Sequence, residues 1–483
     1  MTKGQRHIER RDVNLTRSAF LKGGLAATML PAFAYGSEKP NLRFGFISDI
    51  HIHKPRESAD RVYKPALEWF KAQGVEAVVC TGDLATTGLL SELKHVSDVW
   101  YEVFPDDRLP DGRHVEKVFL YGNHDTSPAV ARAAERHGLG DEFKRETLQL
   151  DSAKAWETNF REKFEPIYIK RVKGYTFVAA HWEGTTPEVT GVPEFLKDHA
   201  AELAGDRPFF YCQHAALRGT VNPLSPGHFD EGKAAEALKE FPNAFALTGH
   251  SHSALTDETS IWQGEFTALC GAACVNSGRR YARPWFENSD IPGSPEGPYP
   301  NRKGSQMPEL NTYRNGGQGL LVDVFDDRIV LQRHSFVFNE PIGPDWVVPL
   351  PLGQEKPFSI EARKKASTPP EFAPGDAIRL AEREGENREK KPTRQLVVSF
   401  PAASRGDRPF GYEITVASDE PGVKPVVKCI LSPDFNLPPS RRVTKAKCVF
   451  ALAGLPSPAH RRVSVRAFNS FQRYGAPLQL IKP

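Results

Sequence analysis

Short apolar runs recur between residues 44 and 252, and each one ends in polar residues of a particular kind. Apolar runs of four or five residues are typical of buried strands. The runs and their polar endings are 44–48 before Asp49 and His51, 77–80 before Gly82 and Asp83, 117–121 before Asn123, His124 and Asp125, 209–212 before His214, and 244–247 before His250 and His252. Packing gives no reason for these endings. The pattern therefore predicts five strand ends that meet in one polar pocket.

Helical patterns separate the first strands. Residues 58–73 show an apolar face at helical spacing and are followed by Gly74, a C-terminal stop. A second helical pattern covers residues 89–103. Alternating strands and helices predict α/β layering with parallel strands inside. Ligands of such sheets bind at the carboxyl ends of the strands, which is where the polar residues fall.

The remaining elements before residue 340 are less regular. Residues 126–175 are charged and predict a mainly helical insertion. A strand over 175–180 ends in His181, for which a core position and a place beside the substrate both remain open. We expect a helix at 231–240 and a β-hairpin formed by 320–325 and 329–333.

A change in composition predicts a domain boundary. Pro, Lys and Glu become frequent around residues 353–370, and strand-like runs then recur at short spacing, at 395–400, 410–417, 426–431, 446–452 and 462–468. Such a series is typical of a small β-sandwich. We predict a catalytic domain over 41–350, a linker over 351–370 and a C-terminal β-sandwich domain over 371–483.

The charge pattern indicates an export signal. Within residues 1–34, six Lys and Arg and two Asp and Glu precede an apolar stretch that ends in Ala32-Phe33-Ala34. Cleavage is expected after Ala34. Cleavage changes the formal net charge from +3 to −1, so we expect no nucleic-acid partner. Thr16–Lys22 resembles a twin-arginine motif, but Ser18 replaces the second arginine, so the general secretory route also remains open.

Further expectations concern location and cysteines. We expect an exported protein, periplasmic or extracellular, with no transmembrane segment; the sequence does not indicate its oligomeric state. Cys429 and Cys448 lie in strand-like runs and could pair in an oxidising compartment. Cys270 and Cys274 lack the second pair that a zinc site of four cysteines requires.

The ordered set of polar endings resembles the calcineurin-like metallophosphoesterases over residues 42–338. The resemblance implies an α/β fold in which a layered β-sandwich is flanked by helices. Seven of the polar residues offer N or O donor atoms: Asp49, His51, Asp83, Asn123, His214, His250 and His252. Seven donors are too many for one ion and suit two divalent ions about 3.5–4 Å apart. Two of the seven donors are anionic, so a loaded site keeps positive charge and attracts a phosphate. No thiolate is among them, so Mn, Fe, Zn and Ni all fit.

The resemblance also implies a role for each residue. Asp83 bridges the ions, and the other ligands form two sets: Asp49, His51 and His252 on one ion, and Asn123, His214 and His250 on the other. His124 faces the substrate, where it binds a phosphoryl oxygen or protonates the leaving group. Asp125 orients His124. A metal-bound hydroxide attacks phosphorus.

We therefore predict a dimetal phosphoester hydrolase acting on small phosphodiesters. A periplasmic phosphomonoesterase that scavenges phosphate, and a catalytically silent binding protein, remain as alternatives. Related phosphodiesterases often have two adjacent histidines where this chain has Gln213 and His214, which argues against cyclic nucleotides. Purple acid phosphatases have a tyrosine ligand at the position where this chain has Thr86, which argues against that subgroup. The C-terminal strands, including Tyr412–Val416 and Val465–Ser470, resemble a fibronectin type III-like module.

Overall fold

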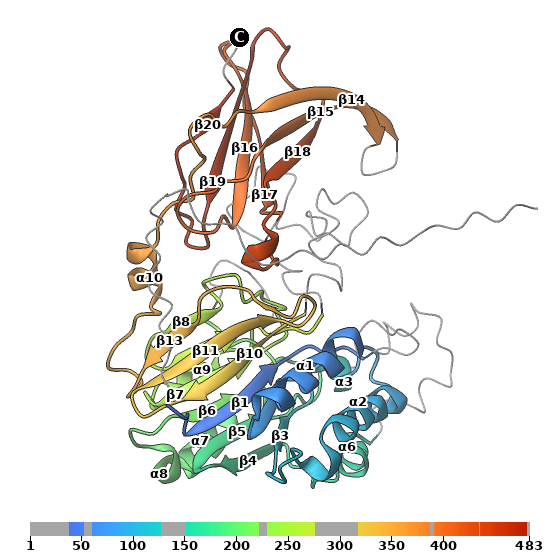
Figure 1. Cartoon of the computed structure of the whole chain (residues 1–483), viewed down its shortest axis with the longest axis vertical. Helices are drawn as coiled ribbons and strands as arrows, with labels where there is room; N and C mark the ends of the chain where they lie inside the picture. The colour runs from blue at the N-terminus through green and yellow to red at the C-terminus, as the bar shows by residue number, and fades with distance from the viewer. Residues whose placement is uncertain are drawn as a thin grey trace, which may run out of the picture. The chain divides into compact units, whose positions relative to one another are not determined.

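A computed structural model of the protein describes residues 38–52, 60–126, 151–221, 229–275, 317–386, 391–433 and 435–480 (Figure 1). The predicted export signal, residues 1–34, lies outside these residues, as does part of the predicted helical insertion, residues 127–150. Within the described ranges, no helix combines the length and the apolar character needed to cross a bilayer.

The first sheet carries the first three polar strand ends. Its order is β12-β11-β10-β1-β2-β3, and β13 pairs with β11. β1, β2 and β3 are parallel, whereas β10 is antiparallel to β1. The strands are β1 (Leu42–Ile47), β2 (Ala77–Cys80), β3 (Glu116–Phe119), β10 (Gln318–Val324), β11 (Arg328–Ser335), β12 (Glu340–Pro341) and β13 (Trp346–Pro349). β10 and β11 form the predicted hairpin.

The second sheet carries the other two polar strand ends. Its order is β4-β5-β6-β7-β9-β8, with β5, β6, β7 and β9 parallel. The strands are β4 (Ile167–Val172), β5 (Tyr175–Ala180), β6 (Phe209–Cys212), β7 (Ala244–Thr248), β8 (Ile261–Gln263) and β9 (Thr267–Cys270).

β4 corrects the prediction of a helical insertion up to residue 175. It is antiparallel to β5 and joined to it by Lys173 and Gly174, both of which have positive φ. Positive φ at both central residues is the requirement of a tight hairpin turn whose twist matches that of the strands. Ile167, Ile169 and the strand that follows supply the apolar alternation that the charged residues nearby obscured.

The two sheets stack face to face, and helices cover their outer faces (Figure 1). Phe44 of β1 contacts Phe177 of β5 and Phe210 of β6, with ring centroids 5.3 and 4.8 Å apart. Residues of α1 (Asp60–Gln73), α2 (Leu90–Val103) and α6 (Ser152–Phe160) share a core with the first sheet. Residues of α7 (Val192–Asp198) and α9 (Lys233–Leu238) share one with the second. The predicted layered β-sandwich flanked by helices is confirmed.

The short helical elements are η1 (Pro105–Asp107), α3 (Asn123–Thr126), α8 (Ala200–Leu203), α10 (Ile360–Ala366) and η4 (Pro439–Arg441). α10 lies within residues 351–370, the predicted linker. Ser359 caps it by accepting a hydrogen bond from the backbone N–H of Ala362.

The C-terminal strands form two antiparallel sheets around one apolar core. The strands are β14 (Arg379–Glu386), β15 (Pro392–Pro401) and β18 (Lys445–Ala451) in one sheet, and β16 (Gly411–Ser418), β17 (Val426–Leu431), β19 (Arg461–Phe468) and β20 (Leu478–Gln479) in the other. The sequence had not indicated β14 or β20. Cys429 on β17 and Cys448 on β18 lie in different sheets and are not joined by a disulfide, so that predicted pairing is wrong.

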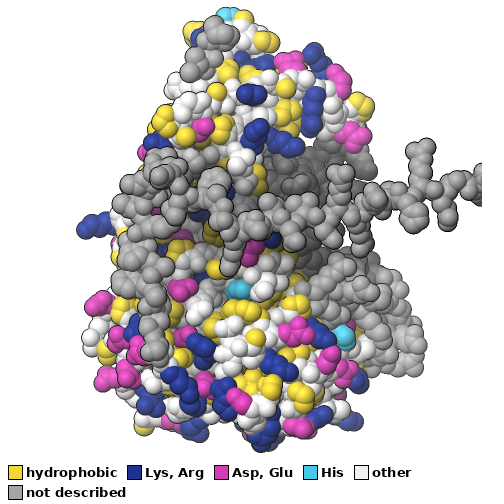
Figure 2. Space-filling view, in the orientation of Figure 1, with side chains coloured by type: hydrophobic (Ala, Val, Ile, Leu, Met, Phe, Trp, Pro, Cys, Tyr) yellow, Lys and Arg dark blue, Asp and Glu magenta, His cyan; other side chains and the backbone are white. Residues whose placement is uncertain are grey.

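Formal charge divides unevenly along the chain. Residues 371–483 contain 19 Lys and Arg against 11 Asp and Glu, a net charge of +8. Residues 35–370 contain 38 against 47, a net charge of −9. The value of −1 expected for the chain after residue 34 is therefore the sum of two strongly charged parts. Figure 2 shows both kinds of charged side chain on the surface.

Candidate metal centre

The loops that follow five parallel strands bring the predicted site residues together. Asp49 and His51 follow β1, Asp83 follows β2, and Asn123 begins α3 after β3. His214 follows β6, and His250 and His252 follow β7. The first group comes from the first sheet and the second from the other sheet. The site therefore lies where the carboxyl ends of both sheets meet, at the edge where α/β sheets bind ligands.

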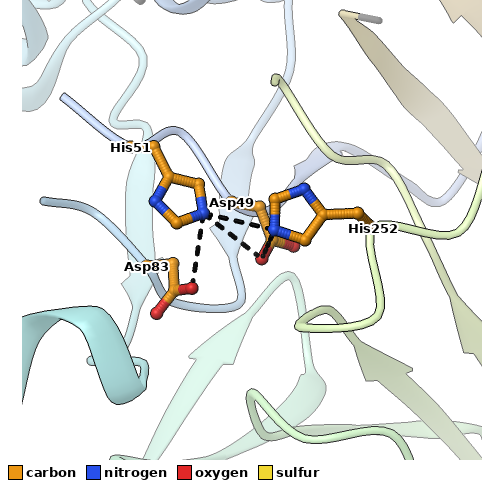
Figure 3. A group of neighbouring side chains, drawn as sticks. All are labelled: Asp49, His51, Asp83 and His252. Carbon is orange, nitrogen blue, oxygen red and sulfur yellow. Dashed lines mark hydrogen bonds and ion pairs between the residues drawn. The ribbon is translucent and has the colours of Figure 1, made fainter. Parts of the chain in front are cut away.

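The first cluster consists of Asp49, His51, Asp83 and His252, whose ligand atoms all lie within 4.8 Å of one another (Figure 3). Nε2 of His51 lies 3.2 Å from Nε2 of His252 and 3.4 Å from Oδ2 of Asp83. Nε2 of His252 lies 3.3 Å from Oδ1 of Asp49. These spacings suit donors around an ion that binds N and O atoms at about 2.0–2.2 Å.

The second cluster shares Asp83 with the first and adds His214 and His250. Nε2 of His214 lies 3.2 Å from Oδ1 of Asp83 and 3.1 Å from Oδ1 of Asn123. The rings of His214 and His250 are 4.8 Å apart. One carboxylate oxygen of Asp83 thus faces each cluster.

Backbone carbonyl groups fix the orientation of two histidine rings. Nδ1 of His214 lies 2.6 Å from the carbonyl oxygen of Thr81, and Nδ1 of His252 lies 2.9 Å from that of Val275. A carbonyl oxygen can only accept, so each Nδ1 carries the hydrogen. The lone pair of each Nε2 therefore faces the cluster, which is the arrangement that metal-ligating histidines use.

The loops hold this arrangement against backbone strain. Left-handed φ values, which are uncommon outside glycine, occur at five of the seven predicted ligands: Asp49, His51, Asp83, His250 and His252. Such a concentration of strained residues is typical of a functional site, where the surrounding structure imposes the conformation.

Gly122 and Gly249 lie so close to side chains of the site that neither position has room for a Cβ atom. A Cβ atom on Gly122 would lie 2.3 Å from Oδ1 of Asp83. A Cβ atom on Gly249 would lie 1.9 Å from Oγ of Ser48 and 2.7 Å from Oδ2 of Asp49. Any side chain at either position would displace a carboxylate of the first cluster.

The electrostatics of the buried carboxylates fit cations. Oδ1 of Asp49 is buried and has no hydrogen-bond partner, although it faces His252. Burial, aided by the charge of Asp83, raises the pKa of Asp49. Burial would also raise the pKa of Asp83, but the charges of His214 and His124 hold it well below its usual range. A buried carboxylate oxygen without a donor is costly, and a bound cation would satisfy it.

The donor atoms indicate a class of metal ion but do not identify the element. The two clusters consist of His and Asp residues together with the amide of Asn123, and no thiolate takes part. Such N and O donors fit two divalent ions, as predicted, and leave their identity undetermined.

Partial exposure marks the open side of the site. His51, Asn123, His124 and His250 keep some exposure, whereas Asp49, Asp83 and His214 are buried. Among the described residues of the site, the open side is therefore the side of these four partly exposed residues.

His124 lies on this open side, and its partner differs from the predicted one. Its Nδ1 donates to the carbonyl oxygen of Thr86 at 2.8 Å, so that Nε2 is the atom available to a substrate. Its backbone N–H donates to Oδ1 of Asp83. Thr86 in turn donates its hydroxyl to the carbonyl oxygen of His51.

Asp125 has a different task from the predicted orientation of His124. Its buried carboxylate accepts hydrogen bonds from the backbone N–H groups of Leu84, Ala85 and Gly122, at 3.2, 2.7 and 2.7 Å. These residues flank Asp83 and Asn123, so Asp125 joins two loops of the site. Burial, and after it the charge of Asp83, raises the pKa of Asp125 against the effect of the three donors.

His181 is a core residue. It is fully buried, its Nδ1 accepts a hydrogen bond from the backbone N–H of Tyr121, and its ring packs on Trp156 and Phe164. Burial lowers the pKa of His181 to about 3. Of the two positions left open by the sequence, the structure selects the core.

Gln213 also points away from the pocket, into a buried network. Its side chain accepts from the hydroxyl of Tyr211 at 2.7 Å and donates to Oδ2 of Asp230 at 3.1 Å. His214, the next residue, faces the pocket instead, where its Nε2 lies 3.2 Å from Oδ1 of Asp83. Gln213 therefore does not line the pocket.

Trp182 is a site residue that sequence reasoning missed. It follows β5, is 5% exposed, and packs its ring 5.8 Å from that of His214 and 5.5 Å from that of His250. Its indole N–H donates to the carbonyl oxygen of Gly184. Its position after another strand of the second sheet was the available signal.

Comparison with known proteins agrees with this geometry. Residues 42–254 match the family described as calcineurin-like phosphoesterases, so this part of the chain is a calcineurin-like phosphoesterase domain with a His/Asp metal-binding cluster. The chain therefore contains a metallophosphoesterase domain. Among curated proteins, none matches this chain.

Several solved structures match part of this chain. A dimetal phosphatase from Danio rerio is 11% identical, with 64% of this chain and 99% of that chain covered and a TM-score of 0.36. GAP50, described as the anchor in the inner membrane complex of Plasmodium, is 13% identical, with 65% and 90% covered and a TM-score of 0.38. A purple acid phosphatase from yellow lupin (Lupinus luteus) seeds is 13% identical, with 64% and 55% covered and a TM-score of 0.39.

Proposed function

We propose that this metallophosphoesterase hydrolyses small phosphodiesters with two divalent metal ions held by the two clusters. Asp49, His51 and His252 would hold one ion, and Asn123, His214 and His250 the other. The observation that carries the proposal is the carboxylate of Asp83, which presents one oxygen to His214 at 3.2 Å and the other to His51 at 3.4 Å. A single carboxylate between two donor sets is the arrangement of a bridged pair of ions.

Each part of the site has a task in hydrolysis. When bound, the two ions would supply a water of lowered pKa and neutralise charge on the phosphate. His124 presents Nε2 on the open side, held there by the hydrogen bond from Nδ1 to Thr86. This nitrogen can hold a proton and give it to the departing alkoxide, which is a poor leaving group unless it is protonated.

The preference for diesters is supported by charge. Residues 35–370 carry a formal net charge of −9. A phosphodiester has one negative charge and a phosphomonoester close to two at neutral pH, so the surrounding field repels the monoester more. The two ions oppose this repulsion at the site itself, and the field of the domain acts on the approach.

The test combines metal content with two substrates. We expect the protein purified without residues 1–34 to bind two Mn²⁺ ions and to cleave bis-p-nitrophenyl phosphate with a higher kcat/KM than p-nitrophenyl phosphate. Asp83→Asn should lose the pairing of the ions and the turnover together, because an amide supplies one oxygen donor where two are needed. Asp98→Asn, an exposed residue of α2, is the matched control.

Each other outcome rejects a specific part. A higher kcat/KM for the monoester would reject the diester preference and indicate the scavenging phosphatase. Two bound ions without hydrolysis of either substrate would reject the hydrolase and indicate the binding protein. Full activity of Asp83→Asn would reject the bridging role.

We also propose that the protein is exported. Support comes from the basic stretch, the apolar stretch and the Ala32-Phe33-Ala34 site within residues 1–34. The full chain and a chain without residues 1–34 should be compared in the fractions of a bacterial host. Export of the shortened chain would contradict the proposal.

A further inference from the structure

The sheet β14-β15-β18 has one face turned to the apolar core of the C-terminal unit and one turned outward. Leu396, Val398 and Phe400 of β15 are buried in that core, together with Cys448 and Phe450 of β18. Because side chains alternate along a strand, the residues between them point outward.

The outward face carries basic residues and no acidic ones among the described residues. Its cations are Arg379 and Arg383 of β14 and Lys445 and Lys447 of β18, all exposed. The other outward residues are Ala381, Gly385, Thr393, Gln395, Val397, Ser399, Pro401, Val449 and Ala451. We call this set the basic face.

The acidic residues of the same strands lie on the opposite side. Glu382 and Glu384 alternate with the basic residues of β14, and both pair with Arg394, at 3.1 and 3.7 Å. On the basic face, the guanidinium of Arg383 donates to the neutral side chain of Gln395 at 3.0 Å. The ion pairs that these strands form within the described residues thus leave the four cations of the basic face uncompensated.

Strand register places the cations close to one another. Arg379 is opposite Ser399, which is opposite Lys447, so these two cations lie about 10 Å apart across two strand spacings. Lys445 and Lys447 are two residues apart on β18, about 7 Å. Like charges at these distances repel, and the cost is relieved by an anionic partner.

A merely solvated face would be expected to mix both signs of charge. Here the imbalance extends beyond the sheet, since residues 371–483 contain 19 Lys and Arg against 11 Asp and Glu. Figure 2 shows Lys and Arg side chains exposed on the surface of the C-terminal unit. The charge therefore indicates a partner and its sign.

We propose that the basic face binds a linear polyanion through its charges. Anionic groups that repeat every 5–10 Å, a range set by the strand spacings above, can contact Arg379, Lys445 and Lys447 in one passage. The described face has no aromatic side chain, whereas proteins that bind single-stranded nucleic acids stack bases on aromatic rings. The occupant is thus recognised as a charged chain and not by bases. This binding is independent of the hydrolytic function.

The test measures binding of dextran sulfate, which contains no phosphate and is not a substrate of the metal centre. With three contacts, we expect affinity to fall roughly 20-fold between 50 and 200 mM salt. The double variant Arg379→Ala/Lys447→Ala should bind on the order of tenfold more weakly, with a smaller salt slope. The charge-keeping variant Arg379→Lys/Lys447→Arg should bind as the unchanged protein does.

A matched control removes two exposed lysines elsewhere, as Lys233→Ala/Lys239→Ala. Equal losses in this control and in the double variant would overturn the proposal, because they would reflect net charge alone. An affinity that does not change with salt concentration would also overturn the proposal. Long-chain polyphosphate should behave as dextran sulfate does, and much tighter binding of oligo(dT) at equal charge would show base recognition and reject the charged-chain occupant.

Discussion

Nδ1 of His124 donates a hydrogen bond to the backbone carbonyl oxygen of Thr86, at 2.8 Å. This bond fixes the tautomer, because the carbonyl accepts and leaves the hydrogen on Nδ1. Thr86 is itself held to the segment that follows β1, since its N–H donates to the carbonyl oxygen of Ile52, the residue after His51. The loop that positions the imidazole is therefore the loop that carries Asp83.

His124→Ala should keep both metal ions and lose turnover by roughly 10²–10⁴. The loss should be larger for an alkyl ester than for a p-nitrophenyl ester, because p-nitrophenolate leaves without protonation. Metal analysis and kcat on both ester types check this expectation. A collapse of metal content would show that His124 is a ligand, and equal losses for both leaving groups would reject its role as the proton donor.

Asp125→Asn should act on the loops and not on proton transfer. An amide offers one oxygen in place of two, so at least one of the N–H groups of Leu84, Ala85 and Gly122 loses its acceptor. An unsatisfied buried donor costs about 1–3 kcal/mol of the free energy of unfolding. Thermal unfolding and metal content should both fall. If Asp125 instead oriented His124, stability would be kept and the leaving-group dependence of His124→Ala would be reproduced.

Trp182→Ala should weaken the second ion more than the first. The indole packs on His214 and His250, and a cavity there would let both rings move, whereas His51 and His252 would hold the other ion. Partners that orient metal ligands are typically worth 10–100-fold in affinity. Titration with Mn²⁺ should show one tight and one weak ion, and Trp182→Phe should restore much of the difference. Equal weakening of both ions would contradict this reading.

The strand ends could be predicted because two independent signals coincide there. Apolar runs locate strands, and Asp, Asn or His directly after them has no packing reason. All nine predicted site residues fall in the described part, on the segments that follow β1, β2, β3, β6 and β7. What each residue contacts was predicted less well.

The role of Asp125 shows why. Asp125 is adjacent to His124 in sequence, but both lie in α3, where successive side chains point about 100° apart. The partner of His124 is a backbone carbonyl, a group that every residue has, so no residue type signals it. Gln213 and His214 are also adjacent in sequence after β6, yet Gln213 contacts the buried Asp230 and His214 contacts Asp83 of the site.

Glu258, on the loop before β8, offers a pH-dependent test away from the metal centre. It accepts hydrogen bonds from Arg333 at 2.7 Å and from the indole of Trp346 at 2.9 Å, and it pairs with Arg363 of α10. Burial opposes ionisation, but the charges of Arg333 and Arg363 lower the pKa of Glu258 to about 2. The ionised form is thus stabilised by folding.

Because the folded pKa lies below the usual value of 4.5, the contribution of Glu258 to stability is complete above pH 4.5 and is lost as pH falls toward 2. Glu258→Gln should lower the free energy of unfolding at pH 7, and its difference from the unchanged protein should narrow below pH 4.5. The narrowing is at most about 1.4 kcal/mol per pH unit, and less because solvent screens a side chain that is one third exposed. Urea unfolding of both proteins between pH 7 and 3 measures it. A difference that stays constant with pH would show that the arginines do not lower the pKa of Glu258 in the folded protein.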